Sequence, residues 1–95
     1  MKIRYTRRSL ANVDRIFRYI ARENPAAATR VIERIEGLIR QLADVPEMGE
    51  TGEMAGIRRL VATPFPYLIF YEVAADEIII HHIRHGARRP LVGPP

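Results

Sequence analysis

Two apolar stripes with helical spacing, separated by one short break, constrain the fold of this chain more than any other feature. Asn24 in the break suits a helix cap and Pro25 suits the first helical position, while Ser9 suits the cap of the first helix. Because the break is short, the two predicted helices must run antiparallel as a hairpin. The stripes consist of Leu10, Val13, Ile16, Phe17 and Ile20 in the first helix, and of Ala28, Val31, Ile32, Ile35, Leu38, Ile39 and Leu42 in the second.

The rest of the chain has the patterns of strands and loops. Strands are expected over residues 2–7, 57–63, 67–73 and 77–85, with a loop over 47–56. The links between the last strands are short, which predicts antiparallel neighbours. Ile83 is out of phase with Ile78 and Ile80, so we expect a bulge near His81 and His82.

These elements predict an α+β fold with the order β-α-α-β-β-β: an N-terminal strand, a helical hairpin and a three-stranded antiparallel meander. We take residues 1–90 as a single domain and 91–95 as a flexible tail, with poor order expected from residue 86 onward. A hairpin with one apolar stripe per helix covers only one face of a sheet. Segment 67–73 is apolar on both faces, and exposed apolar area on a small domain indicates a partner.

Composition excludes several function classes. The 95 residues include no cysteine, which excludes disulfides, a thiol nucleophile and Cys-ligated metals. No apolar run approaches 18 residues and the N-terminus lacks a signal peptide, so we expect a cytoplasmic protein without a membrane partner. His81 and His82 point to opposite faces of a regular strand, so we expect no metal site. The sequence has no glycine-rich phosphate loop, so we also expect neither a cofactor nor a small-molecule substrate.

The net charge of +4 is unevenly distributed. Residues 1–23 carry seven Lys or Arg against two acidic residues, residues 24–56 carry three against six, and residues 57–95 carry five against three. Two basic zones therefore flank an acidic middle. Such a surface attracts an anion, which could be nucleic acid, a nucleoprotein machine or an acidic partner protein.

RNA cleavage is the catalytic activity that these residue types could support. Attack by a ribose 2′-hydroxyl needs a base, an acid and cations for the developing charge. Arg58, Arg84 and His85, with His81 or His82, could supply these groups from adjacent strand ends. The alternative is that Arg58 and its neighbour form salt bridges on the sheet.

Four local motifs, taken in this order of elements, resemble the RelE/ParE superfamily of type II toxin–antitoxin toxins. The similarity extends from residue 1 to about residue 90, and it implies a toxin that a cognate antitoxin neutralises. Superfamily antitoxins often carry a DNA-binding domain, so contact with DNA would be indirect. The motifs are SLANVDRIFRYI from residue 9, LADVPEMG from residue 42, GIRRL from residue 56 with YLIFY from residue 67, and IIIHHIRHGARRP from residue 78.

The superfamily divides by activity. RelE-like members cleave mRNA in the ribosome, whereas ParE-like members inhibit DNA gyrase and are not enzymes. Arg58 lies where RelE-like toxins place an active-site arginine, and Arg84 and His85 lie near their C-terminal functional positions. Those nucleases typically add lysines around the second helix and the following loop. Here the loop carries Glu47, Glu50 and Glu53, which would repel RNA.

The sequence therefore favours a ParE-like gyrase inhibitor that acts by protein binding, without catalytic residues, cofactor or metal. A RelE-like endoribonuclease is the alternative, with Arg58, Arg84 and His85 as its catalytic residues. A decayed toxin that persists as half of a repressor complex is a third reading. The predicted target-binding residues are Arg58, Arg84, His85, Arg88 and Arg89, and the predicted antitoxin-binding residues are Tyr67, Ile69 and Tyr71.

Overall fold

The two stripes form the predicted helical hairpin, and the remaining elements form one sheet. The computed structural model describes residues 1–87. Neither helix there is long and apolar enough to cross a membrane. The elements in chain order are β1 (Lys2–Tyr5), α1 (Arg7–Ala21), α2 (Pro25–Leu42), the 3₁₀ turn η1 (Pro46–Met48), β2 (Glu50–Thr51), β3 (Arg58–Val61), β4 (Tyr67–Val73) and β5 (Glu77–His85).

The helix caps confirm one prediction and correct another. The Asn24 side chain accepts a hydrogen bond from the Ala27 amide, and Pro25 begins α2 as expected. The cap of α1 is Thr6, whose hydroxyl accepts the Ser9 amide at 3.1 Å, so the prediction of Ser9 as the cap was wrong. The first strand ends one residue before Thr6, which therefore begins the helix. Ser9 is buried inside the first turn, where its hydroxyl donates to the Thr6 carbonyl.

The sheet has five strands in the order β1-β5-β4-β3-β2, in which β1 runs parallel to β5 and the other pairs are antiparallel. The two-residue strand β2 lies inside the predicted loop and adds an edge strand to the meander. The predicted bulge is confirmed, because Phe70 pairs with His82 and Tyr71 pairs with Ile80, which leaves His81 as the extra residue.

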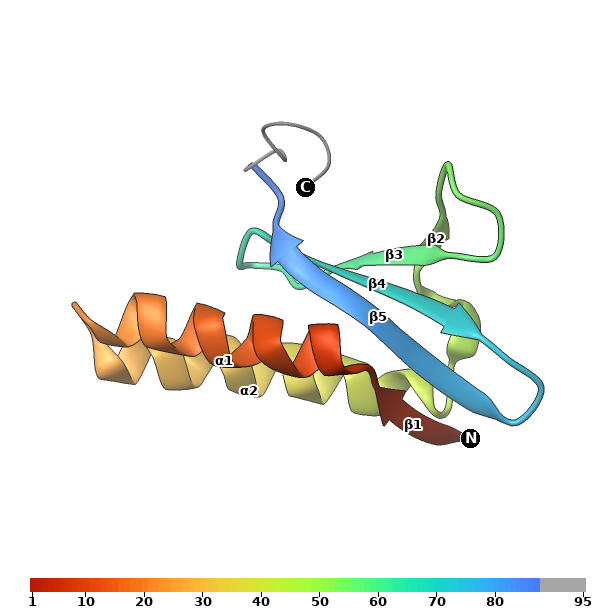
Figure 1. Cartoon of the computed structure of the whole chain (residues 1–95), viewed down its shortest axis with the longest axis horizontal. Coiled ribbons are helices and arrows are strands. Elements are labelled where there is room, and N and C mark those ends of the chain that lie inside the picture. Colours follow the sequence, from red (N-terminus) through yellow and green to blue (C-terminus); the bar gives the residue numbers. More distant parts are fainter. Residues whose placement is uncertain (88–95) are drawn as a thin grey trace.

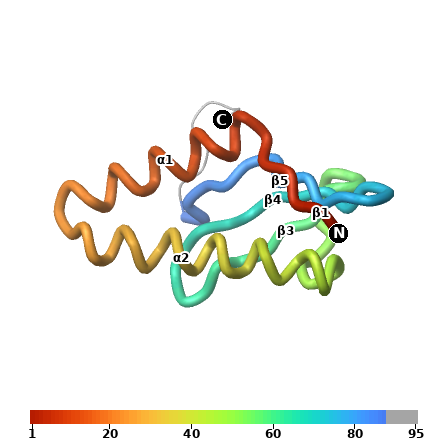
Figure 2. Tube along the Cα trace, turned by 90° about the horizontal axis from the view of Figure 1, so that it is seen from below, coloured from red at the N-terminus to blue at the C-terminus, as the bar shows by residue number. Residues whose placement is uncertain are grey.

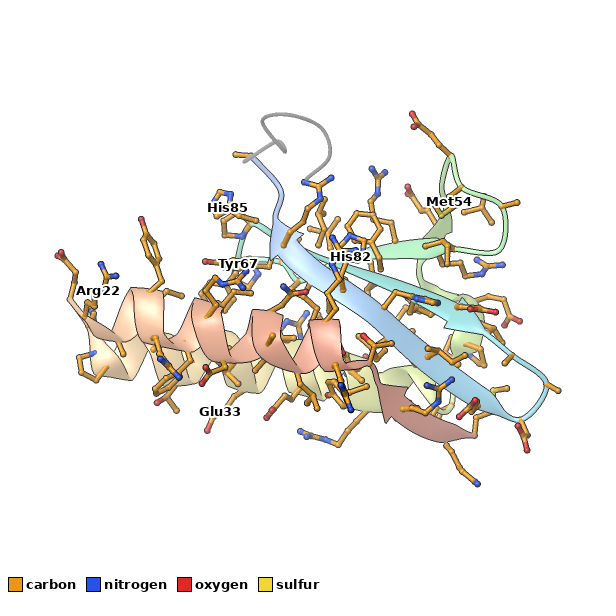
Figure 3. All side chains as sticks on the ribbon, in the orientation of Figure 1. Arg22, Glu33, Met54, Tyr67, His82 and His85 are labelled. Carbon is orange, nitrogen blue, oxygen red and sulfur yellow. The ribbon has the colours of Figure 1, made fainter. Side chains whose placement is uncertain are left out.

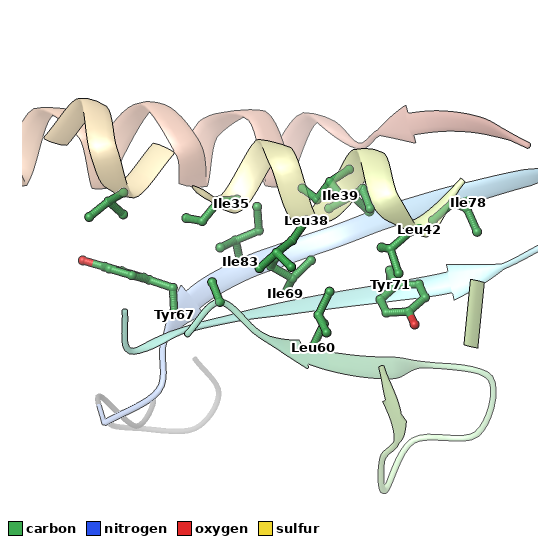
Figure 4. Packing of buried hydrophobic residues seen from close by; sticks show 13 residues of the cluster. Ile35, Leu38, Ile39, Leu42, Leu60, Tyr67, Ile69, Tyr71, Ile78 and Ile83 are labelled. Atoms are coloured by element: carbon green, nitrogen blue, oxygen red, sulfur yellow. The ribbon is translucent and has the colours of Figure 1, made fainter. Parts of the chain in front are cut away.

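Both helices lie on the same side of the sheet, as Figures 1 and 2 show. The core fills the space between α2 and the sheet (Figure 4), and its completely buried members include Ile35, Leu42 and Ile83. Within residues 1–87 no helix covers the opposite side. We call it the open face. By strand alternation and register it carries Arg59, Val61, Leu68, Phe70, Glu72, Ile79, His82 and Arg84.

The structure buries Tyr67, Ile69 and Tyr71, which we predicted as antitoxin contacts together with part of the helix hairpin. Their exposed fractions are 7 %, 0 % and 0 %. All three belong to the hydrophobic core of the protein (Figure 4). The physical reason lies in Glu72, which shares the opposite face with Leu68 and Phe70. Because a charged residue belongs on the wetter side, the alternation around Glu72 was the signal for the correct face.

Candidate functional site

An aromatic and cationic cluster occupies the centre of the open face. The rings of Phe70 and His82 are stacked, with centroids 4.4 Å apart and planes 13° apart. The guanidinium carbon of Arg84 lies 5.2 Å from the Phe70 centroid, within the range of a cation–π interaction. The bulge at His81 puts His82 opposite Phe70, so the irregularity in the strand creates the cluster. His82 lies on the side of the sheet away from the helices (Figure 3).

The charge of this cluster resides on arginine. Burial lowers the pKa of His82 to about 4, and the positive charges of Arg8, Arg84 and His81 act in the same direction. The imidazole is therefore neutral at physiological pH. Arg8 comes from the first turn of α1, so a helix contributes charge beside the open face. The cluster thus offers a flat neutral surface bordered by guanidinium groups.

Acidic residues border the other end of the open face. Glu72 pairs with His81 at 2.8 Å from Oε1 to Nε2, and Glu77 pairs with Arg4 at 3.2 Å. Exposed Glu50 lies 3.5 Å from Arg59. The hairpin formed by β2 and β3 rises on the side of the sheet opposite the helices (Figure 1). The open face consequently has Arg84 toward the end of β5, with Glu72 and Glu77 toward the turn between β4 and β5 and Glu50 along the β2 edge.

The structure brings together only some of the predicted target-binding residues. Arg84 and His85 are adjacent at the end of β5, opposite Leu68 and Tyr67 of β4. Arg58 pairs with Tyr71, which lies three residues farther along β4 than Leu68, or about 10 Å at the usual strand rise. By alternation Arg58 faces the helix side, opposite to Arg84. Arg88 and Arg89 lie outside the described residues.

Arg58 and Tyr71 hold the segment that leads into the acidic hairpin. The Arg58 guanidinium donates to the Gly49 carbonyl at 2.7 Å. The Tyr71 hydroxyl donates to the Pro46 carbonyl at 2.7 Å and accepts from the Gly49 amide at 2.8 Å. Burial raises the pKa of Tyr71, so this hydroxyl keeps its proton. These contacts show that Arg58 anchors the segment around Gly49. Nothing in the sequence indicated that Gly49 is the partner of Arg58.

A pocket of about 230 Å³ lies between α1 and the end of β5. Ile16 and Ile83 are aliphatic members of its lining, and Arg15 and Arg84 bring charge. His85 contacts Tyr67 edge-on there, with ring centroids 5.3 Å apart. Sequence analysis did not identify this pocket, because its members come from three elements that meet only in the fold. The lining residues within the described part of the chain are Asn12, Arg15, Ile16, Tyr19, Tyr67, Ile83, Arg84 and His85.

The edge of β5 beside this pocket is closed by side chains of the N-terminal segment. Pairing with β1 ends at Ile80. Beyond that point the Thr6 hydroxyl donates to the carbonyls of Ile80 and His81, at 3.0 and 2.8 Å. The Ile83 amide donates to Asn12 Oδ1 at 2.9 Å. These contacts hold α1 against β5 and form the wall of the pocket.

The three histidines have separate environments. His81 pairs with Glu72, His82 stacks on Phe70, and His85 contacts Tyr67. Within residues 1–87 no three His, Asp or Glu side chains gather as metal ligands.

Comparison with known proteins identifies relatives over nearly the whole chain. The sequence profile of the family described as "ParE toxin of type II toxin-antitoxin system, parDE" matches residues 3–90. The protein named Toxin RelE2 from Caulobacter vibrioides is 40 % identical over 84 residues, which is 88 % of this chain and 93 % of that protein. The Y4kP protein of Sinorhizobium fredii is 38 % identical over 79 residues, covering 83 % of this chain and 82 % of its own length.

A solved structure has a similar fold. A chain from the structure titled "Chromosomal ParDE TA system from P. aeruginosa" superposes with a TM-score of 0.78 and 25 % sequence identity. The match covers 90 % of this chain and 95 % of that chain.

Proposed function

The chain belongs to the ParE toxin family of type II toxin–antitoxin systems, and we propose that it is a toxin that binds DNA gyrase and stalls it. A cognate antitoxin neutralises it, and contact with DNA is indirect through that antitoxin. The mechanism is protein association, so it requires no cofactor and no small-molecule substrate. Gyrase acts in the cytoplasm, which is where we place the toxin.

The separation of Arg58, Arg84 and His85 is the observation that supports binding over catalysis. RNA cleavage needs its acid, base and cations around one phosphate. Arg58 is held by the Gly49 carbonyl on the helix side of the sheet, whereas Arg84 lies over Phe70 on the open face. His85 packs against Tyr67. These side chains therefore do not converge on a common point.

The open face is the surface that we propose for gyrase. Its central aromatic pair, Phe70 and His82, suits the desolvated core of a protein interface, and the guanidinium of Arg84 lies beside that pair. Arg84 is the principal contact in this proposal, with Arg8 and Arg59 as charged neighbours. His85 follows Arg84 at the end of β5, and we keep Arg88 and Arg89, which lie outside the described residues, among the proposed target contacts.

A supercoiling assay tests the proposal. Purified toxin should inhibit gyrase and trap it on cleaved DNA, and expression of the toxin alone should induce the DNA-damage response. Arg84→Glu should weaken inhibition by about tenfold or more, because it places a like charge against an acidic contact. The control is Arg30→Glu, an equal charge change at an exposed residue of α2. Normal growth and unaffected gyrase with the unmodified toxin would instead indicate a decayed toxin.

Ribosome-dependent mRNA cleavage is the second candidate, and one observation favours it. His82, which is neutral at physiological pH, lies two residues from Arg84 on the open face, so a proton acceptor and a cation are neighbours there. The relative from Caulobacter vibrioides carries the name RelE2. If this candidate is correct, toxin expression arrests translation and leaves cleaved mRNA, and His82→Gln lowers cleavage by about 100-fold or more. A gyrase inhibitor cleaves no mRNA in either form.

A further inference from the structure

We propose that the pocket between α1 and the end of β5 binds an acidic segment of the antitoxin. An apolar side chain of that segment lies against Ile16 and Ile83, and a neighbouring carboxylate contacts Arg15 and Arg84. The inference rests on the proposed function, since it takes the antitoxin as the partner. It adds the site, the chemistry of the bound segment and a route to neutralisation.

The lining determines the chemistry of the occupant. Two arginines and a histidine line the pocket together with aliphatic and aromatic groups, and the eight lining residues found among residues 1–87 include no Asp or Glu. A carboxylate is therefore attracted while a lysine is repelled. The volume of about 230 Å³ is below the roughly 300–1,000 Å³ of pockets that hold drug-sized ligands. It suits one or two side chains of a peptide, as in the anchoring pockets of protein interfaces.

The closed edge of β5 favours a side-chain anchor over an added strand. A peptide that extends a sheet needs free amides and carbonyls along the edge strand. Here the Ile83 amide is already bonded to Asn12, and the carbonyls of Ile80 and His81 are bonded to Thr6. These three groups are therefore not available to an added strand. Side chains that enter the pocket are the contacts that we propose for the partner.

Arg84 connects this pocket to the proposed target surface. It lines the pocket and also lies over the Phe70 ring on the open face. A carboxylate bound in the pocket competes with Phe70 for the guanidinium. An antitoxin segment on the helix side of β5 therefore withdraws the principal gyrase contact without having to cover the whole open face.

A binding experiment tests the site independently of toxicity. The probe is the protein encoded next to the toxin gene, and its affinity is measured for purified wild-type toxin, Arg15→Glu and Arg30→Glu. Arg15 lies on the exposed side of α1, and circular dichroism confirms that each variant folds. We expect Arg15→Glu to weaken binding by about tenfold or more and Arg30→Glu to change it less than about twofold. Equal affinities for all three proteins overturn the inference.

A growth experiment separates this inference from the proposed function. Arg15→Ala expressed alone should remain as toxic as wild type, since it keeps the open face intact and places no carboxylate beside Arg84. Co-expression of the antitoxin should rescue cells that produce wild type or the control Arg30→Ala, but not those that produce Arg15→Ala. Rescue of all three contradicts the proposed pocket and leaves the proposed toxin function unaffected. Loss of toxicity in Arg15→Ala expressed alone also contradicts the proposed pocket, because the pocket would then bind the target. A wild-type chain without toxicity contradicts the proposed function, while the affinities still decide the site.

Discussion

Gly49 illustrates how a single residue positions a whole segment. Its φ of −82° suits any amino acid, so the requirement for glycine is steric. A Cβ there would lie 2.8 Å from the Tyr71 hydroxyl and 2.9 Å from the Arg59 carbonyl. Neither atom can withdraw, because Tyr71 is completely buried and the carbonyl is backbone. Any side chain at Gly49 must therefore push the segment away from the sheet.

Gly49→Ala should lower the free energy of unfolding by about 1–3 kcal/mol through overpacking and strain on the Tyr71 hydrogen bonds. The matched control is Gly52→Ala, three residues on in the same hairpin. Its Cβ would meet the Ile57 carbonyl at an ordinary 3.7 Å, so we expect a change within about 0.5 kcal/mol. Urea unfolding followed by circular dichroism measures both. Two equally stable variants would show that the segment moves freely.

His82 makes stability depend on pH in a defined direction. In the folded protein its pKa is about 4, below the ordinary 6.5 of the unfolded chain. Between these values the unfolded chain binds more protons, so stability rises with pH. The contribution of His82 is complete above pH 6.5 and is lost as the pH falls toward 4.

Between pH 7.5 and 4.5 the wild type should lose about 1 kcal/mol more stability than His82→Gln, a figure reduced for solvent screening of a half-buried ring. Urea unfolding of both proteins at the two pH values measures the difference. An NMR titration of the imidazole checks the cause directly. A folded-state pKa above 6 for His82 would contradict the packing of this ring against Phe70.

At the level of elements, the spacing of apolar residues predicted the helices and the irregularity in the last strand. The helical stripes and the cap at Asn24 gave the hairpin, and the phase break at Ile83 gave the bulge. Periodicity did not determine which face of β4 is covered, because both faces carry large apolar residues and only Glu72 distinguishes them. The pocket was missed for another reason: Asn12 of α1 and Ile83 of β5 are 71 residues apart, and no local pattern links them.

Asn12→Ala should loosen the junction between α1 and β5. Ile83 is 1 % exposed, so its amide would lose a hydrogen bond that water cannot easily replace. We expect a loss of about 1–3 kcal/mol in unfolding free energy and faster exchange of the Ile83 amide. Hydrogen exchange measured by NMR locates the effect. Asn12→Asp keeps an acceptor oxygen and should keep most of the protection; if both variants exchange alike, the side-chain bond does not hold the edge.

For the whole molecule, the distribution of charge decides which polymer reaches the open face. The chain carries a net charge of +4 and would attract nucleic acid without specificity. The acidic hairpin stands on the side of the open face (Figure 1), and Glu50 also pairs with Arg59. A nucleic-acid strand that crosses the face from Arg84 meets these carboxylates. A protein with patches of both signs does not face the same repulsion.

Neutralising the hairpin should therefore open this face to RNA. Glu50→Gln with Glu53→Gln should raise the affinity for single-stranded RNA several-fold at low salt, about threefold to tenfold, by removing repulsion and freeing Arg59. The control is Glu33→Gln with Glu36→Gln on α2, which changes the net charge equally on the other side of the sheet. Fluorescence anisotropy with a labelled oligonucleotide measures both, and gel analysis should show intact RNA throughout. If the RNA affinity of the two double variants rises equally, net charge alone governs RNA binding, and the hairpin does not repel RNA from the open face.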